Sequence, residues 1–280
     1  MSWKDYLVDG EAFFRLSTFL IAFVLMALWE VLAPRRQLRV AKPHRWLNNL
    51  ALVAFNSVAL RLLFPATAVA TAAFAHAQGW GLINYFETPY VVGLLLAMVA
   101  LDGVIYLQHV MFHSVPVLWR IHRVHHADLD YDVTTGLRFH PIEIVLSLMV
   151  KCAAILLLGP PVTAVVLFEI LLNATSLFNH GNVSLPGKTD RVLRWLVVTP
   201  DMHRVHHSVE DDEANSNFGF NLPWWDRLFG TYREAPRGGH VKMVIGIRGC
   251  RDTDQTVPLP ALLLQPFRGD TRGYAINRQE

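Results

Sequence analysis

Cysteine is scarce in this chain. Cys152 and Cys250 are the two cysteines among 280 residues, and nearly a hundred positions separate them. Two distant thiols exclude both a disulfide framework and a cysteine-rich metal site. Any metal ion must therefore be bound by histidine or carboxylate side chains.

Charge is scarce as well. Charged residues make up 17% of the chain and hydrophobic residues 52%, and this balance is typical of a membrane protein. The formal net charge of +2 is too small to indicate nucleic-acid binding. The chain also lacks a glycine-rich nucleotide fingerprint and a haem-binding module. Electrons for any redox reaction must therefore come from a separate protein.

Five apolar stretches predict an all-α integral membrane protein with about four to five transmembrane or deeply inserted helices. They cover residues 13–33, 47–75, 90–113, 142–158 and 162–178. Pro65 interrupts the second stretch, and Gly159-Pro160-Pro161 predicts a tight turn that joins the last two as a hairpin. At about 17 residues each, these two stretches either cross the membrane fully or only enter it deeply.

The basic residues predict the orientation. The loop at 34–46 contains five Lys and Arg residues, whereas the loop at 76–89 contains none. Cytoplasmic loops are enriched in these residues, so we expect the first loop in the cytoplasm and the N-terminus outside. The segments that follow the third and fifth stretches then lie on the cytoplasmic side.

Histidine is in excess, and nine of the 13 histidines fall into four short clusters at one predicted membrane face. Their spacings of three and four residues place imidazoles on a common helix face. Burying nine neutral imidazoles without a shared partner would be costly, and nine ligands exceed the needs of one zinc ion. Two metal ions with four or five imidazoles each fit better. Nitrogen-rich sites with open positions suit iron(II) and O₂, although affinity alone favours zinc.

The clusters resemble the motifs of the fatty acid hydroxylase / sterol desaturase superfamily over about residues 90–235. The similar segments are His109-x-x-x-His113, His122-x-x-His125-His126, His203-x-x-His206-His207, 'NATSLFNHGN' around His180, and 'WDRLFGTY'. The resemblance implies a bundle of membrane helices with a cytoplasmic helical cap that carries the histidine motifs. It also implies that two iron ions are bound by His109, His113, His122, His125, His126, His180, His203, His206 and His207.

One position departs from the superfamily pattern. Some relatives have a further histidine four residues before the one that matches His180, and this chain has Ser176 there. One metal would then have one imidazole fewer, and water or a carboxylate would complete its coordination.

The resemblance implies a membrane-bound non-haem di-iron oxygenase. Such an enzyme uses O₂ and external electrons to hydroxylate or desaturate a C–H bond of a fatty acyl or sterol-like lipid. The implied partners are a membrane lipid and a separate electron donor, a cytochrome or ferredoxin with its reductase. The predicted organisation is an N-terminal membrane anchor over 1–89, a catalytic domain over 90–235 and a C-terminal polar tail over 236–280.

Three alternative functions also involve clustered histidines in a membrane protein. Cleavage of an ether lipid, as in alkylglycerol monooxygenases, stays open because the same histidine motifs serve it. A zinc-dependent membrane hydrolase needs fewer histidines and a catalytic glutamate beside a motif, which is not evident here. A metal transporter would place its ligands near the bilayer midplane rather than at one face.

Polar residues inside the apolar stretches predict supporting contacts. Asp102, Lys151 and Glu169 each lie eleven residues from the expected cytoplasmic end of their helix, which is about 16 Å of depth. With Arg61 they predict a charge-balanced layer below the metal site. We expect His140, Tyr106, Asn173, Asp102 and Glu169 as candidates to support the ligands, with His140 alternatively a further ligand. His44, His76 and His240 are expected to be structural or exposed.

Overall fold

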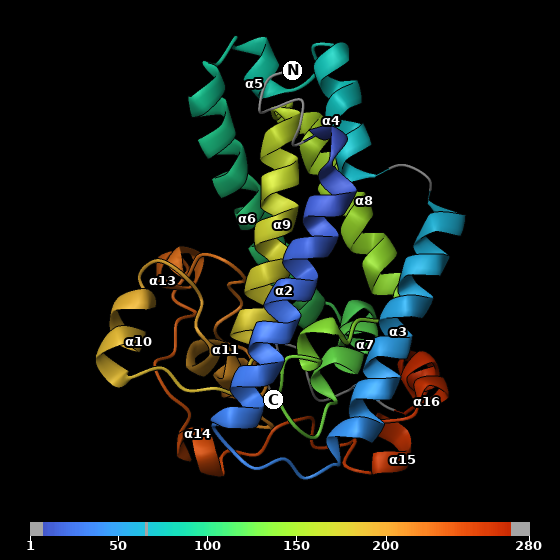
Figure 1. The fold of residues 1–280 in the computed structure, drawn as a ribbon, viewed down its shortest axis with the longest axis vertical. Coiled ribbons are helices and arrows are strands. Elements are labelled where there is room, and N and C mark those ends of the chain that lie inside the picture. The colour runs from blue at the N-terminus through green and yellow to red at the C-terminus, as the bar shows by residue number, and fades with distance from the viewer. Residues whose placement is uncertain (1–7, 65–66, 270–280) are drawn as a thin grey trace.

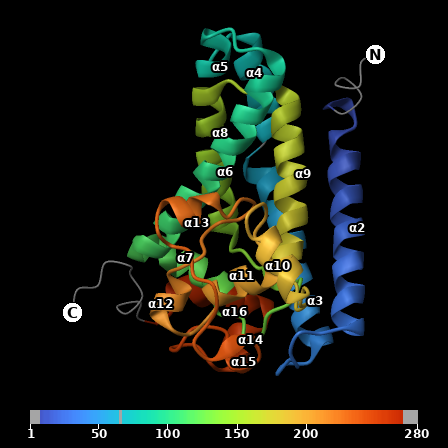
Figure 2. The ribbon, with the colours of Figure 1, turned by 90° about the vertical axis from the view of Figure 1, so that its left-hand side faces the viewer.

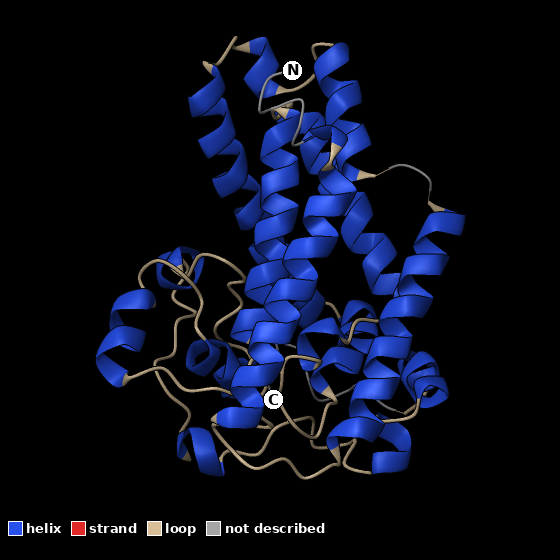
Figure 3. Cartoon of the chain, viewed as in Figure 1, coloured by secondary structure: helices blue, strands red, loops and turns tan. Residues whose placement is uncertain are grey.

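The described part of the chain, residues 8–64 and 67–269 of a computed structural model, is helical and contains no β-strand. Long helices stand side by side as a bundle, and most of the short helices gather at one end of it (Figures 1 and 3). We call this group of short helices the cap. The arrangement confirms the predicted all-α membrane bundle with a helical cap.

The bundle is built from six helices that follow the predicted apolar stretches. Five segments are long and apolar enough to cross a membrane, and one of them, Lys42–Tyr85, combines α3, α4 and the short helix α5 (Leu82–Tyr85). Pro65, the predicted interruption, lies outside the described residues. The helices are α2 (Glu11–Leu32), α3 (Lys42–Leu63), α4 (Ala68–Ala77), α6 (Tyr90–Ser114), α8 (Pro141–Leu158) and α9 (Val162–Asn179).

The outer surface of the bundle suits a lipid environment. Helix α2 stands at one side and packs along α9 (Figure 2). Leu20, Ile21, Leu25 and Leu28 of α2 are exposed, which would be unfavourable in water but is favourable against lipid chains.

Glycines allow the predicted hairpin turn between α8 and α9. Gly159 ends α8 in the left-handed region with φ 62°, a conformation that costs glycine little. A Cβ atom on Gly81, in the loop before the short helix α5 (Leu82–Tyr85), would lie only 2.1 Å from the backbone nitrogen of Gly159. The close approach of these two loops closes the end of the bundle opposite the cap.

The cap comes from segments that are far apart in the sequence. Its elements are α7 (Pro116–His126), η1 (Thr135–Leu137), α10 (Gly187–Leu193), α11 (Pro200–His206), α12 (Asp211–Ala214), α13 (Trp224–Leu228), α14 (Gly239–Lys242), α15 (Thr253–Thr256), α16 (Leu259–Leu264) and η2 (Gln265–Phe267). Residues beyond 235 belong to it in space, because Met243 and Ile245 pack on Tyr131 while Leu262 packs on Val124 of α7. The division of the chain at residue 235 stays a prediction.

A buried ion-pair network fixes the cap to the bundle. Arg45 of α3 is fully buried and lies 2.7 Å from carboxylate oxygens of Asp128 and Asp132, in the loop after α7. Burial by itself would raise the pKa of Asp128, but the guanidinium of Arg45 lowers it to about 2. The basic loop therefore also holds the segment that follows the second histidine motif.

Candidate metal centre

Four elements place the nine clustered histidines. His109 and His113 lie in the last turns of α6, and His180 is the C-cap residue of α9. The other six lie on α7 and at α11, which are short cap helices. All nine side chains are buried, with at most 5% of any residue exposed.

The structure brings the nine histidines together in two groups. Within each group, one ring nitrogen per histidine lies within 4.8 Å of the others. The five-histidine cluster consists of His109, His113, His122, His126 and His206, and the four-histidine cluster of His125, His180, His203 and His207.

The tautomers in the five-histidine cluster point to a metal ion. The Nδ1 atom of His109 lies 2.8 Å from the carbonyl oxygen of Phe218, and that of His206 lies 2.8 Å from the carbonyl oxygen of Ser216. A carbonyl oxygen only accepts, so each Nδ1 carries the proton and each Nε2 presents a lone pair. The two Nε2 atoms are 3.0 Å apart. Two lone pairs that face each other repel, whereas a metal ion between them would accept both.

The other distances fit the same interpretation. In the five-histidine cluster, the Nε2 atoms of His113 and His126 are 3.1 Å apart. In the four-histidine cluster, the Nε2 atom of His180 lies 3.2 Å from those of both His125 and His203. Two nitrogens bound at about 2.1 Å to one ion, at right angles, are about 3.0 Å apart. The donor atoms therefore fit one metal ion in each cluster.

His207 gives an independent indication in the four-histidine cluster. Neither of its buried ring nitrogens has a hydrogen-bond partner among the described residues. Leaving a buried polar group unpaired is costly. A metal ion at the centre of the cluster would supply the missing partner.

The electrostatics keep these imidazoles in the form that binds metals. Burial, and then the neighbouring imidazoles, lower the pKa of His125, His126, His203 and His207 well below its usual value. Burial also lowers the pKa of His180 to about 4. At neutral pH these side chains are uncharged, and a neutral imidazole is the ligand form.

Aromatic rings surround both clusters, although no pattern in the sequence predicted this contact. Phe139 stacks on His125 with ring centroids 4.4 Å apart and also contacts His122. The ring of Phe220 lies 6.0–6.3 Å from those of His109, His180 and His203. Each phenylalanine thus touches a histidine from both clusters. Phe220 also packs against the apolar core of the bundle, so the site meets the membrane helices at this ring.

Glu143 is a contact that the sequence analysis missed. Its Oε1 atom lies 2.7 Å from Nδ1 of His122, and both side chains are buried. Glu143 is in the first turn of α8, at the start of the fourth apolar stretch. Its spacing from His140 in 'FHPIE' was the available signal.

The predicted supporting residues have other partners. His140 caps α8 by accepting from the backbone nitrogen of Ile142, and its other ring nitrogen lies 3.2 Å from the carbonyl oxygen of Leu263. Asn173 donates to the carbonyl oxygen of Glu169 in its own helix. Among the described residues, the hydrogen bonds of these two side chains therefore do not reach the clustered histidines.

Tyr106 contacts the metal centre indirectly, through Phe218. Its hydroxyl is 2.9 Å from that of Thr231, and its ring packs edge-on against Phe218, whose carbonyl accepts from His109. Ser176, at the position of the missing histidine, donates to the carbonyl oxygen of Gly136.

The charge-balanced layer is corrected by the structure. Lys151 and Glu169 form the expected pair, with Nζ and Oε1 2.5 Å apart. The second cation on Glu169 is Arg15 of α2, at 2.9 Å, and not Arg61, which is exposed. The prediction failed because it aligned depth along helices but could not know which faces of α2 and α3 meet α9.

Asp102 belongs to a different contact. It accepts from the side chains of Asn221 and Trp225 and from the backbone nitrogen of Leu222. Asp102 therefore anchors the cap loop that contains Phe218 and Phe220 to α6, instead of joining the charged layer.

Comparisons with known proteins agree with this geometry. The fatty acid hydroxylase family model matches residues 94–231, which contain all nine histidines. The ornithine lipid hydroxylase OlsE of Rhizobium tropici is 28% identical over 272 residues, covering 93% of this chain and 78% of that protein. An alkylglycerol monooxygenase of Xenopus tropicalis is 32% identical over 142 residues, covering 49% of this chain and 30% of that protein.

A more distant relative is a sterol hydroxylase. The cholesterol 25-hydroxylase of Rattus norvegicus is 25% identical over 168 residues, covering 58% of this chain and 53% of that protein. The match thus spans less than two thirds of the alkylglycerol and cholesterol enzymes. No solved structure matches this chain. The motifs, the family model and the relatives together show that the chain is a membrane oxidoreductase of the fatty acid hydroxylase / sterol desaturase superfamily.

Proposed function

We propose that this protein is a non-haem di-iron oxygenase that hydroxylates a C–H bond of a membrane lipid. The observation that carries the proposal is the pair of buried histidine clusters, with five and four converging imidazoles. Hydroxylation is favoured over desaturation because the relatives compared above are hydroxylases and monooxygenases.

The histidines of the two clusters would hold the two iron ions. Bound there, the irons would supply the reductive activation of O₂ that oxidises an unactivated C–H bond. The protein would position the metal ions and exclude water. Neutral, buried imidazoles would hold the metals, and Phe139 and Phe220 border both clusters. Excluding water protects a strongly oxidising site from side reactions.

The lipid chain would approach from the bundle. Phe220 joins the site to an apolar core that contains Leu101, Ile105 and Phe168 from α6 and α9. An apolar chain between the membrane helices would place one carbon beside Phe220, while the polar head stays at the membrane surface. The electrons would come from a separate cytochrome or ferredoxin.

The orientation is part of the proposal. The basic loop at 34–46 lies at the cap end of the bundle, as its contacts with Asp128, Asp130 and Asp201 require. Because cytoplasmic loops are enriched in Lys and Arg, this position supports a cytoplasmic location of the cap and the metal clusters.

A second candidate is cleavage of an ether lipid. It is favoured by the identity of 32% to an alkylglycerol monooxygenase across the motif region. Hydroxylation of the carbon beside an ether oxygen would give an unstable product that breaks down, so the same site would serve this reaction.

Elemental analysis and Mössbauer spectroscopy of protein expressed with iron-57 test the proposal. We expect about two iron ions per chain, fewer in a His125→Ala variant, and oxidised lipid when O₂, a reductant and membrane lipids are supplied. His44→Ala is the matched control because His44 lies outside both clusters. Tightly bound zinc that iron does not replace would instead support a hydrolase and contradict the proposal.

A further inference from the structure

Glu143 differs from every other partner of the clustered histidines. Among the described residues, it supplies the only carboxylate oxygen within ion-pair distance of the nine imidazoles. The Nδ1 atoms of His109, His113, His180 and His206 lie beside neutral groups, which are backbone carbonyl oxygens and the side-chain oxygen of Asn215. No described residue gives the four-histidine cluster such an anionic partner.

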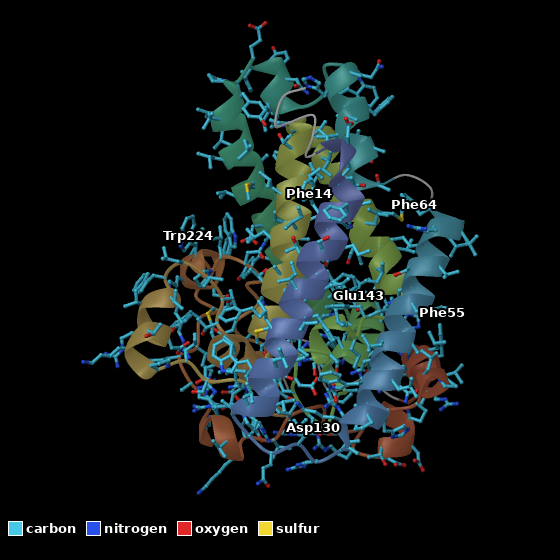
Figure 4. The ribbon with its side chains drawn as sticks, viewed as in Figure 1. Phe14, Phe55, Phe64, Asp130, Glu143 and Trp224 are labelled. Carbon is cyan, nitrogen blue, oxygen red and sulfur yellow. The ribbon has the colours of Figure 1, made fainter. Side chains whose placement is uncertain are left out.

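The fold holds Glu143 in place before any metal binds. The residue is in the first turn of α8, where the helix dipole favours a negative charge. The ring of His140 caps the same turn. The side chain of Glu143 is 5% exposed, and its Oε2 atom has no hydrogen-bond partner among the described residues. Figure 4 labels it at the level where the long helices meet the cap. Its buried contact is therefore directed to His122.

We propose that Glu143 is a positioning residue that makes the two metal ions unequal; this inference rests on the proposed function. Accepting a hydrogen bond from Nδ1 fixes His122 in the tautomer whose Nε2 faces the cluster centre. A carboxylate partner also increases the electron donation of the imidazole, more than a neutral carbonyl does. The metal in the five-histidine cluster is thus bound more tightly and reduced at a lower potential than its neighbour.

The substitution Glu143→Gln tests the role of the charge. Glutamine keeps the size and an acceptor oxygen but removes the negative charge. The metal-free, detergent-solubilised full chain is titrated with Co²⁺, whose visible bands report each occupied site. We expect two sites in the wild type, and in the variant one of the two weakened by about 10- to 100-fold. After reconstitution with iron-57, one Mössbauer signal should change and the other should not.

Glu213→Gln is the matched control. Glu213 is a buried cap glutamate whose carboxylate accepts from the backbone nitrogen of Arg237 and contacts no clustered histidine. This variant should retain both sites and both signals.

The outcomes separate this inference from the proposed function. A wild type that binds no metal pair contradicts the proposed function. A wild type with two sites, together with a Glu143→Gln variant of unchanged affinity and spectrum, overturns the role of Glu143 alone. If the glutamine variant does not fold, Glu143→Asp is compared instead, because aspartate keeps the charge but is too short for the 2.7 Å contact. Unchanged affinity and spectrum in that folded variant would also overturn the role.

Discussion

At the residue scale, His207 shows that neighbouring residues of one histidine motif belong to different clusters. It is the histidine with two unpartnered ring nitrogens among the described residues, and it belongs to the four-histidine cluster. The adjacent His206 belongs to the other cluster. Two neighbours in one motif thus face different clusters, as His125 and His126 of α7 also do. Adjacent side chains on a helix point about 100° apart, so they cannot face the same centre.

Replacing His207 with alanine should remove one metal and leave the other. The four-histidine cluster would keep three imidazoles, while the five-histidine cluster stays complete. We expect the metal content to fall from about two to about one per chain, with activity lost. Elemental analysis checks this, and His240→Ala, outside both clusters, is the control. A His207→Ala protein that still binds two metals would show that the clusters are assigned wrongly.

The metal-free protein should lose stability on acidification between about pH 6.5 and 4. Burial lowers the pKa of His180 to about 4 and lowers the pKa of several other clustered histidines. In this window the unfolded chain binds more protons than the folded one, so the free energy of unfolding falls as the pH falls.

Buried aspartates act differently from the imidazoles. Burial raises the pKa of Asp226 to about 6 and also raises the pKa of Asp130. Such carboxyls act in the opposite direction, but the clustered imidazoles outnumber them. Asp128 has a pKa of about 2, lowered from 3.8. Its contribution to the free energy of unfolding is therefore lost only between about pH 3.8 and 2, below the range tested. Melting temperatures measured from pH 7.5 to 4.5 test the sign; a melting temperature that rises toward pH 4.5 would contradict it.

At the scale of elements, a buried charged contact joins α2 to α8 and α9. Glu169 of α9 pairs with Arg15 of α2 and with Lys151 of α8. Arg15 also contacts Glu11 at 3.3 Å, so two cations and two anions meet at the junction of three helices. Buried charges in a membrane protein need such pairing.

The shared carboxylate predicts unequal effects of two substitutions. Glu169→Leu leaves both cations without their common partner, and breaking a buried pair costs about 3–5 kcal/mol. Lys151→Met should cost less, because Arg15 still neutralises Glu169. Thermal unfolding in lipid nanodiscs measures the order of the two variants. A larger loss in Lys151→Met than in Glu169→Leu would show that Arg15 does not share the charge.

At the scale of the whole molecule, the cap and the loop that contains α5 lie at opposite ends of the bundle (Figure 1). Gln78, just before that loop, and Lys188 in α10 are both exposed. In the proposed orientation Gln78 lies outside the cell and Lys188 in the cytoplasm.

Cysteine labelling tests this orientation. With Cys152 and Cys250 replaced by serine, we expect a membrane-impermeant maleimide to label Gln78→Cys in intact cells. Lys188→Cys should react only after the membrane is opened. The reverse pattern would place the metal clusters outside the cytoplasm and would contradict the assignment from the basic loop.

The sequence by itself determined the membrane class, the five apolar segments and the family of this protein. Composition and hydropathy act along the chain, and His-x-x-His-His spacing is a local pattern, so neither needs a fold to be recognised. The same local spacing predicts the nine histidines as metal ligands.

Only the tertiary structure decided which histidine belongs to which cluster, that Glu143 supports His122, and that Arg15 replaces Arg61 beside Glu169. These contacts join elements whose relative rotation and register depend on packing between helices. Distances along one helix fix depth and face, but they carry no information about the neighbour that a face meets.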